Sequence, residues 1–131
     1  MFVDASAIVG ILGSDEDADI LSMRLSQADR IYTSAIAVYE AVLGLARNCD
    51  LSIGEAMEAV AQFLVESHAE VIPIDIVIGQ DALRAFERFG RGRHPAQLNM
   101  GDCFAYACAR ALDVPLLFKG DDFGQTDIAL A

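Results

Sequence analysis

The segment GDCFAYACARALDVPLLFKGDDF, residues 101–123, has an apolar interior and acidic residues at both ends: Asp102 near its start and Asp121 and Asp122 at its end. Its pattern predicts a helix over residues 102–112 and a short buried strand over residues 115–118. The residues that we expect to be largely buried are Ala105, Ala109, Leu112, Leu116 and Leu117. Burial of this interior would fix the positions of the flanking carboxylates.

The rest of the chain alternates short apolar segments with helical patterns. Strands are predicted at residues 2–3, 30–33 and 71–75. A short helix is predicted to open at residues 6–9, and a second helix follows the acidic run 14–17. Further helices are predicted over residues 34–47, 52–68 and 76–89. In the helix over 34–47, the residues predicted to pack inward are Ile36, Tyr39, Val42, Leu43 and Leu45. This alternation indicates an α/β fold whose mostly parallel sheet is covered on both faces. Ligands of such sheets bind at the carboxyl ends of the strands.

Length and composition are those of one domain spanning residues 1–131, because 54% of the residues are hydrophobic and no linker interrupts them. No apolar run is long enough for a membrane span, and the N-terminus has no basic leader, so a cytoplasmic protein is expected. Cys49, Cys103 and Cys108 are odd in number and lack metal-binding spacing, which argues against disulfides and zinc.

The charge balance excludes broad adhesion to nucleic acid, because nine basic residues face twenty acidic ones and the net charge is −11. Arg84, Arg88, Arg91, Arg93 and His94 form the only basic cluster. Arg91, Arg93 and His94 are candidate RNA contacts in a glycine-containing loop. The alternative is a solvated helix end whose arginines favour the helix dipole.

Carboxylates follow the predicted strands or open the predicted helices. Asp4 comes directly after the first strand, Asp121 and Asp122 follow the last, and Asp102 lies in a first helical turn. Singly, each has an ordinary explanation as a helix cap, an N-terminal helix acid or a turn residue. Together they border one edge of the sheet, where clustered carboxylates repel unless they are protonated or bind metal.

Glu40 is the acid that helix propensity does not explain. It lies in SAIAVYEAVLGLA, residues 34–46, where it is the only charged residue. Unless Glu40 faces solvent, an ionised carboxylate among such neighbours requires a partner from elsewhere in the fold. Oxygen ligands without nearby His or Cys select hard cations, so Mg²⁺ or Mn²⁺ is indicated.

Four segments carry a family resemblance: MFVDASAIVGIL, TSAIAVYEAVLGL, HPAQLNMGDCFAYACAR and PLLFKGDDFGQTDI. In order along essentially the whole chain, they resemble the successive motifs of PIN-domain proteins, specifically the VapC-like ribonuclease toxins of toxin–antitoxin pairs. The resemblance implies a three-layer α/β/α domain with a mostly parallel sheet of four or five strands. It also implies that the catalytic and metal-binding quartet is Asp4, Glu40, Asp102 and Asp122.

Two further positions are assigned by the same resemblance. Ser6 matches a small hydroxyl residue that holds a ligand or a water, and Asp121 is an auxiliary residue where many relatives have Asn. Gly120 departs from the many PIN domains that carry an acid there.

The resemblance implies a Mg²⁺- or Mn²⁺-dependent endoribonuclease that a cognate VapB-like antitoxin inhibits. It further implies a homodimer that forms a hetero-oligomer with the antitoxin, with the helices around 34–47 and 52–67 as a candidate interface.

Two other functions are compatible with an α/β domain of this kind. One is a catalytically inactive PIN fold that acts as a co-repressor with a DNA-binding antitoxin. The other is a receiver-like or phosphatase-like domain, in which Asp4 and Lys119 would hold a phosphoryl group. The second alternative leaves Glu40 without a role.

Overall fold

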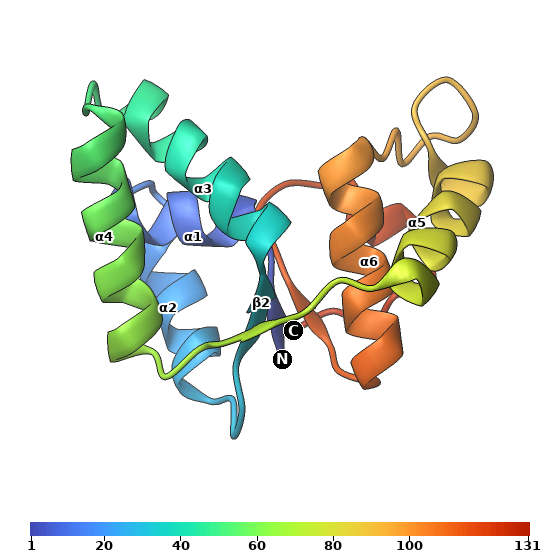
Figure 1. Ribbon diagram of the computed structural model, residues 1–131, viewed down its shortest axis with the longest axis horizontal. Helices are drawn as coiled ribbons and strands as arrows, with labels where there is room; N and C mark the ends of the chain where they lie inside the picture. The colour runs from blue at the N-terminus through green and yellow to red at the C-terminus, as the bar shows by residue number, and fades with distance from the viewer.

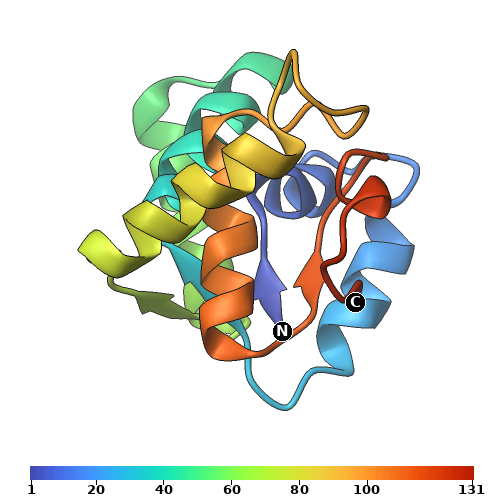
Figure 2. The same ribbon diagram turned by 90° about the vertical axis from the view of Figure 1, so that its right-hand side faces the viewer.

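A four-stranded parallel sheet forms the centre of the protein, for which we describe residues 1–131 of a computed structural model. The strand order is β3-β2-β1-β4. The strands are β1 (Phe2–Val3), β2 (Tyr32–Ser34), β3 (Glu70–Ile72) and β4 (Leu116–Leu117). Figure 2 shows β1 and β4 side by side and pointing the same way. The predicted α/β class with a parallel sheet is confirmed.

Helices cover both faces of the sheet and give three layers (Figure 1). One face carries α1 (Ala5–Leu12), α2 (Ala18–Ser26), α3 (Ala35–Asn48) and α4 (Ile53–Glu66). The other carries α5 (Ile76–Phe89), α6 (Met100–Leu112) and a short 3₁₀ helix, η1 (Phe123–Gln125). None of the helices is both long and apolar enough to pass through a membrane.

Alternate residues of each central strand supply two separate cores. Phe2 and Leu116 pack into the core beneath α5 and α6, whereas Val3 and Leu117 pack into the core beneath α1 to α4. This division follows from the two-residue period of a strand. Ala105, Ala109, Leu116 and Leu117 are buried as predicted, and Leu112 is partly buried.

Two predicted boundaries shift for local reasons. The third strand was predicted to reach Asp75, but it ends at Ile72, before Pro73, which lacks an N–H to donate. Asp75 instead caps α5 by accepting hydrogen bonds from the backbone N–H groups of Val77 and Ile78. Similarly, α6 begins at Met100 and not at residue 102, because Asn99 is its N-cap.

The prediction that Tyr39 and Leu43 pack inward is wrong, since they are 66% and 40% exposed. The apolar face of α3 is wider than the surface that α1 and α4 cover. The uncovered part forms a groove of about 440 Å³ between α3 and α4. All ten of its lining residues are hydrophobic: Ala35, Val38, Tyr39, Val42, Leu43, Ile53, Met57, Val60, Ala61 and Leu64.

Candidate active site

A polar cleft of about 500 Å³ lies at the carboxyl ends of β1 and β4, where the predicted site was expected. Only two of its thirteen lining residues are hydrophobic. Its lining includes Asp4, Ser6, Glu40, Arg47, Asn99 and Asp102. Three of the four predicted catalytic acids therefore line one cleft: Asp4 follows β1, Glu40 lies in α3 and Asp102 lies in α6.

Asp4 is both a helix cap and a buried site residue. It is 5% exposed, and its Oδ2 accepts hydrogen bonds from the Ser6 backbone N–H (2.9 Å) and hydroxyl (2.5 Å). The Ser6 hydroxyl in turn accepts a hydrogen bond from the Lys119 backbone N–H at 3.0 Å. Ser6 thus connects the ends of the two central strands and fixes the orientation of the Asp4 carboxylate.

Asp102 is held by a capping box at the start of α6. The Asn99 side chain accepts a hydrogen bond from the Asp102 N–H at 3.0 Å, and Asp102 Oδ2 accepts one from the Asn99 N–H at 2.9 Å. Positions in the first turn of a helix favour negative charge. The box leaves the other carboxylate oxygen of Asp102 free of bonds within the protein.

Glu40 reaches the cleft from the middle of α3 and packs against the backbone of Gly101. A Cβ atom built on Gly101 would overlap the Glu40 carboxylate, so residue 101 must be glycine for Glu40 to occupy this position. Glu40 is only half-buried, and neither a hydrogen bond nor an ion pair within the protein compensates its charge.

Burial and mutual repulsion raise the pKa values of the acids in the cleft. Burial, followed by the charges of Asp4 and Asp102, raises the pKa of Glu40 to about 7. Burial raises the pKa of Asp102 to about 6; the charges of Asp4 and Asp122 also raise it, whereas the hydrogen bond from Asn99 and the charge of Arg91 lower it. Burial also raises the pKa of Asp4, against the hydrogen bonds from Ser6 that lower it.

The two acids after β4 lie at the margin of the cleft. Asp122 is exposed at the start of η1, and its charge raises the pKa values of Asp4 and Asp102. Asp121 is also exposed, and its carbonyl accepts a hydrogen bond from the Gly124 N–H in the same turn. The structure therefore couples Asp122, and not Asp121, to the carboxylates of the cleft.

The predicted RNA-contact residues lie in the loop between α5 and α6. Arg91 is exposed, and its charge lowers the pKa of Asp102. The Arg93 guanidinium lies 5.6 Å from the ring centroid of Phe86. The Nδ1 atom of His94 accepts a hydrogen bond from the Ala96 N–H at 3.1 Å. Arg91 is thus the one of the three whose charge reaches the acids of the cleft.

The carboxylates as they stand do not enclose a metal ion, because no group of three His, Cys, Asp or Glu side chains is arranged to hold one. The donor set nevertheless fits a hard divalent cation, since it consists of oxygen atoms. The mutual repulsion that raises the pKa values of Glu40 and Asp102 would fall on cation binding. Asp4, Glu40 and Asp102 are the residues that could hold it.

Lys119 lines the same cleft without neutralising these acids. Its Nζ atom lies 2.7 Å from Asp15 Oδ2 and 3.8 Å from Asp17 Oδ2. A receiver-like site would need this lysine beside Asp4. Its pairing with the turn between α1 and α2 therefore argues against that alternative.

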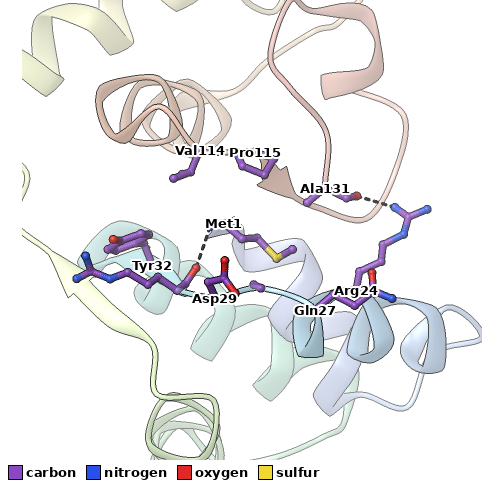
Figure 3. Close-up of a pocket in the computed structure, with 10 residues that line it drawn as sticks. Met1, Arg24, Gln27, Asp29, Tyr32, Val114, Pro115 and Ala131 are labelled. Atoms are coloured by element: carbon purple, nitrogen blue, oxygen red, sulfur yellow. Dashed lines mark hydrogen bonds between the residues drawn. The ribbon is translucent and has the colours of Figure 1, made fainter.

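A second cleft of similar size, about 520 Å³, lies at the opposite ends of the strands (Figure 3). The Met1 ammonium donates a hydrogen bond to the Arg30 carbonyl there, and Arg24 donates one to the Ala131 carbonyl, each at 2.9 Å. Asp29 is the only carboxylate side chain in its lining. Volume does not distinguish the two clefts, but the gathering of acids does.

Several residues of the cleft were not predicted from the sequence. The spacing Asn99-x-x-Asp102 matches a capping box and could have identified Asn99. Arg47 lies seven residues after Glu40, which places both on one helix face and could also have been noticed. No local signal identifies the requirement for Gly101, because that depends on contact between α3 and α6.

Comparisons with known proteins agree with this description. Residues 1–129 match the model of the PIN domain family. A VapC ribonuclease of Rhizobium meliloti is 42% identical, covering 97% of this chain and 98% of that protein. Ribonuclease VapC28 of Mycobacterium tuberculosis is 38% identical, covering 100% of this chain and 97% of its own length.

A solved structure shares the fold. The crystal structure of VapC20 of M. tuberculosis, described as a toxin that cleaves the sarcin–ricin loop, matches with a TM-score of 0.80. The match covers 99% of this chain and 97% of that chain at 16% identity.

Replacement of Glu40 by Gln should stabilise the cation-free protein in a pH-dependent way. The pKa of Glu40 rises from 4.5 to about 7 on folding, so the folded state binds this proton more tightly. The contribution of the protonated Glu40 carboxyl to the stability of the folded state is full below the unfolded pKa and is lost as the pH rises through about 7. Melts in EDTA should therefore show a small gap in Tm between Glu40→Gln and wild type at about pH 5 and a wider one at about pH 8. An equal gap at both values would contradict this assignment.

Replacement of Gly101 by Ala should displace the Glu40 carboxylate from the cleft, because the new methyl group would overlap it. The overlapping atoms are the end of a flexible side chain, so the free energy of unfolding should change little, but Mn²⁺ should raise the Tm less than in wild type. Gly79→Ala in α5 is the matched control, since a Cβ there meets no atom within 4 Å, and its Tm should respond to Mn²⁺ as that of wild type does. Thermal melts of both variants with and without Mn²⁺ measure the effect. An unchanged response to Mn²⁺ in Gly101→Ala would contradict the placement of Glu40 against Gly101.

Proposed function

Because the chain belongs to the PIN domain family and, within it, to the VapC ribonucleases, we propose that it is a divalent-cation-dependent endoribonuclease, the toxin of a toxin–antitoxin pair. The observation that supports this most is the convergence of Asp4, Glu40 and Asp102 from three different elements in one cleft. Their raised pKa values are typical of functional sites. A protein nucleophile is not needed, and neither histidine lines the cleft.

The chain's own residues supply orientation in this mechanism. Ser6 and Asn99 hold Asp4 and Asp102 in fixed rotamers, and Gly101 allows Glu40 to approach them. When bound, Mg²⁺ or Mn²⁺ would lower the pKa of a coordinated water and neutralise phosphodiester oxygens. Without a cation, Glu40 has a pKa of about 7 and is partly protonated near neutral pH, and it would lose that proton when a cation binds. The acids together would thus favour hydrolysis of an RNA phosphodiester by water.

The proposed partner is a VapB-like antitoxin, for which the names of the relatives are the support. A net charge of −11 and a cleft of carboxylates would attract Lys or Arg side chains of that partner into the site. A complex that forms unchanged after Asp4, Glu40, Asp102 and Asp122 are all neutralised would contradict this part of the proposal.

We also propose that a second copy of the chain covers the groove between α3 and α4. Tyr39, Leu43, Ile53 and Met57 are between 40% and 66% exposed there, which is unusual for a contiguous apolar surface. Cytoplasmic localisation is consistent with an RNA substrate and is part of the same proposal.

Neutralisation of Asp4 or Asp102 should abolish RNA cleavage while the fold is retained. Asp4→Asn and Asp102→Asn should each reduce cleavage at least about a hundredfold, more than loss of a residue that only orients a ligand. Asp113→Asn is the matched control, because Asp113 lies at the opposite end of α6 and makes the same change of charge. The assay is cleavage of total RNA by antitoxin-free protein in Mn²⁺, with EDTA as a blank.

Thermal melts of the same proteins distinguish an inactive binding partner from an enzyme. Mn²⁺ should raise the Tm of wild type and of Asp113→Asn, and raise it less in the two site variants. A Tm shift without cleavage of any RNA would favour the inactive co-repressor. Cleavage that persists in EDTA or in Asp102→Asn would contradict the mechanism.

A charge placed in the groove between α3 and α4 should dissociate the proposed dimer. Met57→Glu should weaken self-association at least tenfold, because a buried unpaired carboxylate is costly. Val65→Glu is the control, since Val65 lies on α4, is 75% exposed and does not line the groove. Sedimentation equilibrium decides the matter: a monomeric wild type, or equal dissociation of both variants, would exclude this interface.

A further inference from the structure

Most basic side chains of the protein are already used in contacts within the chain. Ion pairs engage Arg30 with Glu70, Arg84 with Asp81, Arg88 with Asp127, and Lys119 with Asp15 and Asp17. Of the others, Arg24 donates to the Ala131 carbonyl and Arg93 lies over the Phe86 ring. The side chains left without such a contact are Arg47, Arg91 and Arg110.

Arg47 lies beside the carboxylates on the α3 side of the cleft. It is exposed in the last turn of α3, on the same helix face as Glu40 and Gly44, and all three line the cleft. Seven residues of helix separate it from Glu40, which corresponds to about 10 Å along the axis. Arg47 is therefore too far along the helix to neutralise Glu40 directly, yet close enough to contact a ligand that Glu40 also meets.

Arg91 lies on the α6 side of the same acids. Its backbone N–H donates a hydrogen bond to the Leu98 carbonyl at 2.9 Å, which closes the loop onto the residue that precedes Asn99. Asn99 and Asp102 form the capping box of α6. The loop that carries Arg91 therefore ends at the residue that holds the Asp102 carboxylate. The charge of Arg91 lowers the pKa of Asp102.

The two arginines come from segments on opposite sides of the sheet. In Figure 1 the C-terminal end of α3 rises at the upper left, and the loop between α5 and α6 lies at the upper right. Both segments also lie at the upper end of the molecule in Figure 2, toward which β1 and β4 point. One unpaired cation therefore stands on each side of the carboxylate cluster.

We propose that Arg47 and Arg91 bind phosphates on either side of the scissile bond and so hold an RNA strand across the cluster of Asp4, Glu40 and Asp102. This inference rests on the proposed ribonuclease function. A chain with a net charge of −11 repels a polyanion over most of its surface, so binding requires local cations where cleavage occurs. Phosphate contacts of this kind position the nucleic acid without specifying its sequence.

The experiment measures salt-dependent binding of a labelled mixed-sequence single-stranded RNA of about twenty nucleotides by fluorescence anisotropy. All proteins carry Asp102→Asn, which blocks turnover, and Mg²⁺ is present. Arg47→Gln and Arg91→Gln should each weaken binding roughly fivefold to tenfold at about 50 mM salt. Each should also reduce the slope of log K against log salt by about 0.7, the value for one lost contact to a single strand.

Two controls separate charge from structure. Arg110→Gln removes an exposed, unpaired arginine on the far part of α6 and should change neither affinity nor slope. Arg47→Lys keeps the charge and should keep the slope. Unchanged slopes for both Arg47→Gln and Arg91→Gln, or an equal loss in Arg110→Gln, would overturn the inference.

Steady-state kinetics of RNA cleavage by Arg47→Gln and Arg91→Gln, without Asp102→Asn, complete the test. Arg47→Gln and Arg91→Gln should raise KM more than they lower kcat. If the wild-type protein cleaves RNA but neither variant changes KM or binding, the proposed function stands and the inference fails. If no RNA is cleaved in Mg²⁺ or Mn²⁺ and none is bound, both fail.

Discussion

The structure depends on how carboxylates are held immediately beyond an apolar core. Val3 is fully buried, and the next residue, Asp4, is 5% exposed. A carboxylate in such a position requires hydrogen bonds, which Ser6 donates to Asp4 and the backbone N–H of the N-cap residue Asn99 donates to Asp102. Glu40 lies in the middle of a helix and has no such donor. Burial and the charges of Asp4 and Asp102 raise its pKa to about 7, and a bound cation would offset those charges.

The site also joins the two halves of the molecule. Val3, α1 and α3 belong to one core, whereas α5 and α6 belong to the other. Glu40 extends from α3 to the backbone of Gly101 in α6, and Ser6 in α1 accepts a hydrogen bond from Lys119 after β4. The carboxylates can therefore assemble only after both helical layers have packed on the sheet. Ligand binding at this cleft would stabilise the association of the layers as well as the local loops.

The sequence was sufficient where a local pattern has one physical solution. Alternating buried residues in Phe2–Val3 and Leu116–Leu117 identify the central strands, and Asp4 and Asp102 follow from strand ends and helix starts. It was insufficient for α3, where the apolar pattern suggested an inward Tyr39 that is in fact 66% exposed. Helical periodicity gives the width of an apolar face but not the number of neighbours that cover it. The requirement for glycine at position 101 likewise depends on contact with α3, which is distant in sequence.

Glu40 illustrates why a residue that breaks a local rule indicates function. In a segment that is otherwise uncharged over residues 34–46, a neutral side chain would avoid the repulsion from Asp4 and Asp102. The fold instead accommodates Glu40 with a glycine beneath it and leaves it without a counter-charge. Arg47 and Arg91 remain unpaired nearby, although a protein with twenty acidic residues has many partners to offer. Unpaired charges of both signs around one cleft lower stability without a ligand, and they are explained most simply if a cation and a polyanion bind there.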